Sequence, residues 1–312
     1  MKKPVVVFVV GPTASGKTEL AAKLAKHFDS AVISADSMQI YKCMHIASAA
    51  PDEEEMYGVP HKLFEFLPYG EAYTVADYAQ AARSEVDKLL SAGKTPVVAG
   101  GTGLYINALA DNISFLPAKT DCVLRERLEA EFDRSGGETM LKKLAEIDKA
   151  TADKLSVSDR RRIIRALEIY YTSGFTKSEQ DARSKDSPPY FYPIIIGLNY
   201  LNRKTLYDKI NVRVDKMIEK GLITEARQAF EKNIKTGAAQ AIGHKEFFGH
   251  FRGEQSQAEA IDALKRATRR YAKRQLTWFN RDMRINWIYR DEAEDAFAQA
   301  LKIIETEEKR NV

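Results

Sequence analysis

Eight residues near the N-terminus carry the strongest chemical signal in the sequence. Positions 11–18 read GPTASGKT, which matches the pattern G-x-x-x-x-G-K-[ST]. An apolar run, VVVFVV, precedes the match and a helix-like segment, 19–28, follows it, as a phosphate-binding loop requires. The backbone N–H groups of such a loop and the start of its helix bind a diphosphate. The residues predicted to bind it are Gly11, Thr13, Ala14, Ser15, Gly16, Lys17 and Thr18.

Two side chains of this loop have their own chemistry. Lys17 provides a mobile positive charge for the phosphates. The Thr18 hydroxyl is a suitable ligand for Mg²⁺, so Mg²⁺ is the predicted cofactor and Thr18 its predicted metal ligand.

Asp36 follows a second short apolar segment, 30–35. If that segment is a parallel strand, Asp36 lies at the carboxyl edge of the sheet, where ligands of open α/β sheets bind. Its position is compatible with a magnesium ligand, a general base or a helix N-cap. A phosphate-binding loop alone does not establish ATP as the ligand, and these three roles stay open from position alone.

A third apolar segment, 94–99, ends in GGTGLY at 100–105. The glycines would let the backbone approach a ligand, and Thr102 would then offer its hydroxyl to a phosphate or leaving group. A plain strand-to-helix turn explains the motif equally well.

Alternating strands and helices predict an α/β fold with a parallel, P-loop NTPase-like sheet. Expected strands cover 2–10, 30–35, 94–99 and 194–198, and expected helices cover 19–28 and 73–92. Residues 121–180 are charged and helix-like, so 115–190 is predicted as a helical insertion domain. The core would comprise 1–114 and 191–312, with helices at 203–220, 222–232, 239–249, 257–282 and 291–310.

Composition narrows the class of protein. Of the 312 residues, 44% are hydrophobic and 29% charged, which is typical of a globular protein. No apolar run is long enough for a membrane span, and the short N-terminal run leads straight into the phosphate loop, so neither membrane attachment nor a signal peptide is expected. Two cysteines exclude a disulfide framework, and a cytoplasmic location is expected.

Positive charge gathers in two segments. Residues 265–284 contain eight basic residues and one acid, and residues 159–166 contain four arginines and one acid. These segments are either polyanion-binding surfaces or solvated helix faces. In the first, Tyr271 is a candidate for base stacking, whereas Trp278 and Phe279 are expected to pack in the core.

Taken in order, the motifs resemble the tRNA dimethylallyltransferase family, also called isopentenyl-tRNA transferases. The resemblance runs from Val5 to about Arg284. It rests on GPTASGKT, SADSMQIY (34–41), GGTGLY, RRIIRALE (161–168), INVRVDKMIEKGLITE (210–225) and QAIGHKEF (240–247).

The resemblance implies transfer of a dimethylallyl group from dimethylallyl diphosphate to N6 of the adenosine 3′ to the anticodon, in tRNAs that read codons beginning with U. It implies that Asp36 is the general base, that Thr102 lies near the leaving oxygen and that Arg213 binds diphosphate. The partner would be the tRNA anticodon stem-loop, bound by a monomer. The implied tRNA contacts are Asp36, Ser37, Met38, Gln39, Thr102, Arg160, Arg161, Arg162, Ile163, Arg165, Gln240, Gly243, His244 and Lys245.

One position departs from the family pattern, because His244 stands where a tyrosine is expected. Three other functions compete with the tRNA reading: a P-loop kinase of a nucleoside or small metabolite, an adenylate isopentenyltransferase acting on free AMP, and an RNA-binding protein with a relict P-loop. The basic segments favour RNA over AMP, and intact Lys17, Thr18, Asp36 and Arg213 disfavour a relict loop.

Overall fold

The computed structural model describes residues 2–115, 121–184, 187–233, 238 and 241–311. Within them the chain divides into two compact units. One comprises Met1–Ala110 and Pro189–Val312, and the other is Asp111–Pro188. Gln240, a predicted RNA contact, lies outside the described residues.

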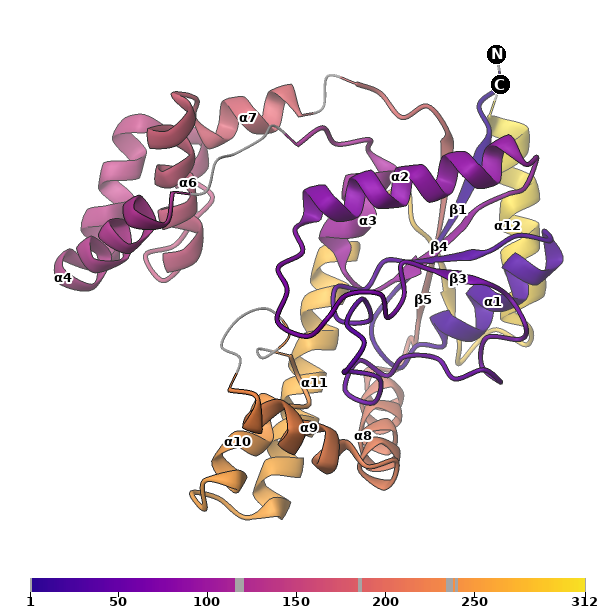
Figure 1. Cartoon of the computed structure of the whole chain (residues 1–312). Helices are drawn as coiled ribbons and strands as arrows, with labels where there is room; N and C mark the ends of the chain where they lie inside the picture. Colours follow the sequence, from indigo (N-terminus) through magenta and orange to yellow (C-terminus); the bar gives the residue numbers. More distant parts are fainter. Residues whose placement is uncertain (1, 116–120, 185–186, 234–237, 239–240, 312) are drawn as a thin grey trace. The chain divides into compact units, whose positions relative to one another are not determined.

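A parallel sheet is the centre of the first unit (Figure 1). Its order is β3-β2-β4-β1-β5-β6, and every neighbouring pair is parallel. The predicted α/β, P-loop-type core is therefore confirmed. The strands are β1 (Val5–Val10), β2 (Val32–Ser34), β3 (His61–Lys62), β4 (Val97–Gly100), β5 (Tyr192–Asn199) and β6 (Asn286–Tyr289).

Strand β1 is apolar on both sides because both faces of the sheet are covered. Val6, Phe8 and Val10 pack on one face with α2 (Val75–Ser91) and α3 (Gly103–Ala110). Val7 and Val9 pack on the other with α1 (Lys17–His27) and α12 (Ala296–Arg310). Because Val6–Val10 are fully buried, each of these side chains contributes apolar burial that favours β1 at the centre of the sheet.

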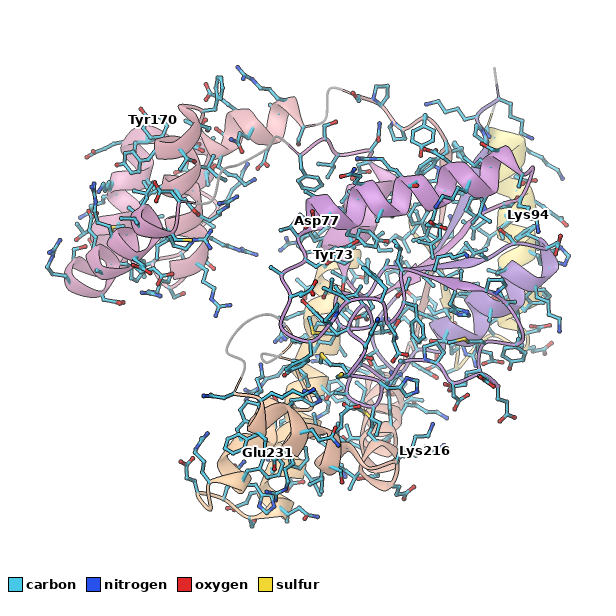
Figure 2. The ribbon with its side chains drawn as sticks, viewed as in Figure 1. Tyr73, Asp77, Lys94, Tyr170, Lys216 and Glu231 are labelled. Atoms are coloured by element: carbon cyan, nitrogen blue, oxygen red, sulfur yellow. The ribbon has the colours of Figure 1, made fainter. Side chains whose placement is uncertain are left out.

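Helix α2 shows how local sequence fixes an element. Thr74 caps it: the Thr74 Oγ1 accepts the Asp77 N–H, and the Asp77 carboxylate accepts the Thr74 N–H at 2.8 Å. Tyr73 and Asp77 are labelled at this end of α2 in Figure 2, and Lys94 lies beyond its other end. This capping box sets where α2 begins and hence which face it turns to the sheet.

Four more helices complete the first unit: α8 (Arg203–Glu219), α9 (Leu222–Glu231), α10 (Lys245–Phe251) and α11 (Gln257–Phe279). Their shared core includes Val214, Leu222, Phe247 and Leu264. Phe279 is 1% exposed and Trp278 packs against the sheet core, as expected.

The second unit is helical throughout its named elements: α4 (Cys122–Ile147), α5 (Lys149–Ala152), α6 (Arg160–Ser173) and α7 (Lys177–Arg183). Gly136, with φ +79°, breaks the regular path of α4. Leu128, Met140, Leu144 and Leu167 form the core of this unit.

The structure corrects three details of the predicted elements. Strands β3 and β6 were not predicted. The helix expected over 239–249 begins only at Lys245, because 241–244 form a turn in which Gly243 has φ +112°. Among the described residues, no helix combines the length and apolar composition needed to cross a membrane.

Candidate active site

The carboxyl ends of β1, β2 and β4 lie side by side and bring the three N-terminal motifs together. The Ala35 N–H donates to the Ala99 carbonyl at 2.7 Å, and the Thr102 N–H donates to the Ala35 carbonyl at 3.2 Å. Asp36 therefore lies against the turn that carries Thr102. This juxtaposition follows from parallel strand register.

The glycines of GGTG make room for protein atoms. A Cβ on Gly100 would lie 2.1 Å from the Ala35 carbonyl oxygen, and one on Gly103 would lie 2.2 Å from Trp278 Cδ1. On Gly101 it would lie 2.1 Å from Gln275 Nε2. The strand-to-helix-turn interpretation thus accounts for these glycines.

The phosphate loop has the backbone that its sequence predicts. Gly11 has φ +139°, Ala14 +64° and Gly16 +88°. Gly16 is the N-cap of α1 and supplies no side chain to cap its amides. Ser15 Oγ is buried without a hydrogen-bond partner among the described residues. Uncapped N–H groups at a helix start favour an anion.

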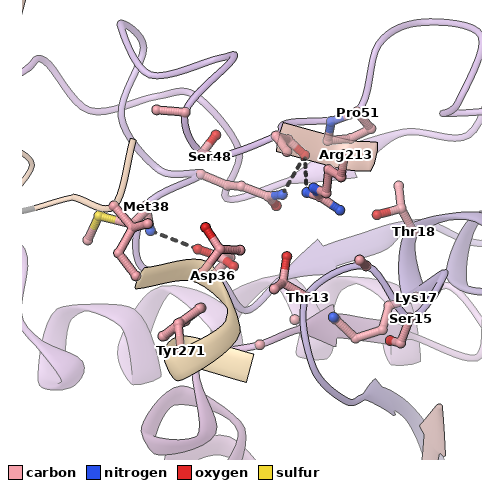
Figure 3. Close-up of a pocket in the computed structure, with 18 of the residues that line it drawn as sticks. Thr13, Ser15, Lys17, Thr18, Asp36, Met38, Ser48, Pro51, Arg213 and Tyr271 are labelled. Carbon is pink, nitrogen blue, oxygen red and sulfur yellow. Dashed lines mark hydrogen bonds between the residues drawn. The ribbon is translucent and has the colours of Figure 1, made fainter. Parts of the chain in front are cut away.

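A cavity of about 500 Å³ opens over this loop (Figure 3). Volumes of this size are typical of small-molecule sites. The predicted residues that line it are Thr13, Ala14, Ser15, Gly16, Lys17, Thr18, Asp36, Ser37, Met38, Gln39, Arg213 and Lys245.

Two half-buried cations, Lys17 and Arg213, face this cavity (Figure 3). Burial, reinforced by the nearby Arg213 charge and opposed by Asp36, lowers the pKa of Lys17 to about 7. Burial also lowers the pKa of Arg213, although the Glu55 and Asp36 charges oppose that shift. The Lys17 Nζ donates to the Pro12 carbonyl at 2.6 Å. Two desolvated cations next to each other favour a bound polyanion.

Asp36 is oriented by its own turn. Its Oδ1 accepts the Met38 N–H at 2.9 Å. Tyr271 of α11 lines the same cavity, and burial together with the Asp36 charge raises the pKa of its hydroxyl. The Tyr271 hydroxyl therefore stays protonated and neutral beside the carboxylate.

Thr102 contacts Ser37, the residue that follows Asp36. Its Oγ1 accepts the Ser37 N–H at 3.0 Å and lies 3.2 Å from Ser37 Oγ, to which it donates. In this arrangement the Thr102 hydroxyl positions the residue after Asp36. The predicted contact with a leaving oxygen requires the Thr102 hydroxyl hydrogen to turn away from Ser37 Oγ.

A loop at 46–49 forms another wall of the cavity. Its Ala49 carbonyl accepts long hydrogen bonds of 3.4 Å from both Gln39 Nε2 and Arg213 Nη2 (Figure 3). The loop is anchored by Glu225, whose carboxylate accepts the Ile46 and Ala47 N–H groups at 2.8 and 2.9 Å.

His244 belongs to this anchor. Its side chain is fully buried and its Nε2 lies 2.9 Å from Glu225 Oε1. Glu225 thus joins His244 to the 46–49 loop. His244 supports the wall of the cavity, and its predicted tRNA contact remains a prediction, as does that of Gly243, which precedes it.

The arginine segment predicted to contact tRNA lies in the helical unit, on α6. Arg161 and Arg162 are exposed. Arg160 pairs with Asp133 at 3.0 Å, and Arg165 pairs with the buried Glu168 at 2.9 Å. Ile163 is fully buried in the core of its unit. The predicted tRNA contact of Ile163 stays a prediction.

Two of the oxygen-bearing side chains of this cavity, Thr18 and Asp36, fit a magnesium ion that is also bound by a phosphorylated ligand. The described residues hold no cluster of three or more His, Cys, Asp or Glu side chains. Thr18 and Asp36 line one cavity with the phosphate loop. Mg²⁺ usually takes one or two protein oxygens and completes its shell with phosphates and water.

Sequence reasoning missed Gln275 and Glu225 as parts of the site. The signal for Gln275 was present: it is four residues after Tyr271 and three before Trp278, so helical spacing places a lone glutamine on the aromatic face of α11. Glu225 closes the motif at 210–225, but its role as an anchor could not be read from the sequence, because its partners are some 180 residues earlier in the chain.

Comparisons with known proteins show the family of this chain. The sequence profile described as IPP transferase matches residues 39–282. A tRNA dimethylallyltransferase of Acetivibrio thermocellus is 45% identical over 289 residues, covering 92% of each chain. One of Bacillus subtilis is 42% identical and covers 92% of this chain and 90% of its own length.

Two solved structures are also similar. The tRNA isopentenylpyrophosphate transferase of Bacillus halodurans is 37% identical with a TM-score of 0.72, covering 99% of this chain and 98% of its own. A eukaryotic dimethylallyltransferase described as acting on tRNA is 27% identical with a TM-score of 0.81, covering 98% of this chain and 79% of its own. The chain belongs to the IPP transferase family.

Proposed function

We propose that this protein transfers a dimethylallyl group from dimethylallyl diphosphate to N6 of the adenosine 3′ to the anticodon, in tRNAs that read codons beginning with U. The products are the prenylated adenosine and diphosphate. One observation carries the proposal: this chain belongs to the family, and its Lys17 and Arg213 side chains line the same cavity as the Asp36 carboxylate. The arrangement combines an anion site with a base.

The anion site suits a diphosphate that leaves whole. As the carbon–oxygen bond breaks, negative charge grows on the diphosphate. Lys17, Arg213 and the amides that begin α1 stabilise that charge electrostatically. Mg²⁺ bound through Thr18 and the phosphates would neutralise further charge.

The prenyl group needs an apolar surrounding. Met217, Ile242 and Leu264 line the same cavity as the phosphate loop. They provide a wall that excludes water from an electron-poor carbon, which water would otherwise hydrolyse.

Asp36 accepts the proton that N6 releases when its nitrogen attacks the prenyl carbon. The Met38 amide holds Oδ1 and so fixes the direction of the carboxylate. The target base must leave the anticodon stack to reach Asp36, and a loop nucleotide can do so at less cost than a paired one.

A monomer is the proposed active form. The reaction is proposed to occur in the cytoplasm, where tRNA is available.

The test offers the purified protein dimethylallyl diphosphate, Mg²⁺ and unmodified tRNA. Mass spectrometry of the digested nucleosides is expected to show N6-dimethylallyladenosine at the position 3′ to the anticodon. Prenylated AMP without prenylated tRNA would instead support an adenylate isopentenyltransferase. ATP-dependent phosphorylation of a small acceptor would support a kinase.

A further inference from the structure

Helix α11 contacts both catalytic loops through one side chain. Gln275 is 5% exposed. Its Oε1 accepts the Thr13 N–H of the phosphate loop at 2.8 Å, and its Nε2 donates to the Gly101 carbonyl at 3.0 Å. A single amide thus bridges the loop that follows β1 and the turn that follows β4.

Only an uncharged group with one donor and one acceptor satisfies both partners. Thr13 offers a donor and Gly101 an acceptor, so a carboxylate, a hydrocarbon or an ammonium group fails at one or both. A Cβ on Gly101 would lie 2.1 Å from Gln275 Nε2, so a side chain at this position would displace the Gln275 amide from the bridge.

The bridge also determines which amides are free for the ligand. The Thr13 N–H points to Gln275, although Thr13 was predicted to bind diphosphate. Thr102, which adjoins Gly101, holds the residue after Asp36. The distance between the phosphate loop and the base therefore depends on the Gln275 amide.

We propose that Gln275 is a positioning residue that sets the phosphate loop against the Thr102 turn, beside which Asp36 lies, so that the leaving group and the base lie at the distance that the transfer needs. This inference rests on the proposed function. Under this inference α11 does more than present positive charge. Its Gln275 side chain aligns the loops that follow β1 and β4.

The first variant is Gln275→Met, which keeps the length and removes both hydrogen bonds. We expect kcat to fall about 10- to 100-fold, since misplacement by about 1 Å has effects of this size. The Kd for dimethylallyl diphosphate, measured without RNA, should change less than about threefold, because the α1 amides and Lys17 are untouched.

Gln257→Met is the matched control. Gln257 begins the same helix and is exposed, so the same chemical change should leave kcat within about twofold.

The second variant, Gln275→Glu, tests whether the hydrogen-bond pattern of the Gln275 amide, and not only the volume of its side chain, determines the rate. When ionised, it presents a carboxylate to the Gly101 carbonyl. When protonated, it reproduces the amide pattern, since its O–H donates to Gly101 and its C=O accepts from Thr13. Asp36, Tyr271 and Arg274 line the same cavity, so rates are compared with the unchanged chain at each pH. We expect the relative kcat to rise about tenfold or more from pH 8 to pH 6.

An unchanged kcat in Gln275→Met would overturn the inference, and so would equal factors of loss in kcat and diphosphate affinity. A relative kcat of Gln275→Glu that is independent of pH would overturn it even if Gln275→Met does not fold. Inactivity of the unchanged chain in the same assay would refute the proposed function instead.

Discussion

Lys17 gives the sharpest quantitative prediction. The perturbation is pH, applied to the binding of dimethylallyl diphosphate in the absence of RNA. Lys17 has a pKa of about 7 in the free protein, because it is buried near Arg213. A bound diphosphate surrounds its Nζ with negative charge and raises the pKa again. Binding above pH 7 therefore takes up a proton.

The sign and size follow from that shift. Only the protonated lysine binds well, so affinity is highest below pH 7 and falls as pH rises. At a pKa of about 7, roughly half of the free protein is protonated at pH 7.0 and roughly 3% at pH 8.5. Kd should rise about 15-fold between these values, or about 1.6 kcal/mol. The second ionisation of a phosphate monoester, near pH ~6, lies below this range.

Titration calorimetry provides the assay. At pH 8.5, the binding enthalpy should depend on the ionisation enthalpy of the buffer with a slope of about one proton taken up. Lys23 lies on the same helix, with its side chain 40% exposed and paired with Glu19, and Lys23→Met should retain the profile. Lys17→Met should bind weakly with little pH dependence. An affinity that changes less than twofold between pH 7.0 and 8.5, or that rises with pH, would refute the argument.

Three further predictions follow from the site. Asp36→Asn keeps the shape but accepts no proton, so single-turnover rates should fall about 10²- to 10⁴-fold; equal weakening of RNA affinity, measured by fluorescence anisotropy, would instead indicate a binding role. Gly103→Ala places a Cβ 2.2 Å from Trp278 Cδ1 and should lower the free energy of unfolding by about 1–3 kcal/mol in urea titrations; no loss would show that Trp278 moves freely. Glu225→Gln replaces one of the two carboxylate oxygens by an NH₂ group that faces a backbone N–H, which should cost about 1–3 kcal/mol of stability in urea titrations. A variant with unchanged stability and unchanged kcat would contradict the role of Glu225 as the anchor of the 46–49 loop.

The parts of the fold that sequence predicted are those with local causes. The phosphate loop needs glycines at Gly11 and Gly16 for its backbone angles, and its flanking strand is apolar on both faces. Asp36 could be placed at the sheet edge because it directly follows a buried strand. The short β3 could not be predicted, since two residues, His61 and Lys62, show no periodicity.

The missed features depend on partners far apart in the sequence. Strand β6 has a single fully buried residue, Ile288, and gains its place only by pairing with β5. Gln275 reaches Thr13 across 262 positions. The low pKa of Lys17 arises from burial beside Arg213, a residue of another helix. Such effects need the tertiary structure, because no window of sequence contains both partners.

The place of β1 in the sheet has a consequence for synthesis on the ribosome. Val5 pairs with Tyr192 and Val7 with Val97, so the first strand made lies between two strands made much later. The unit 111–188, whose core is internal, is complete before β5 emerges. We expect the helical unit to resist protease in nascent chains stalled just before β5 leaves the ribosome, while β1 keeps an uncovered edge that invites aggregation or chaperone binding until β5 pairs with it.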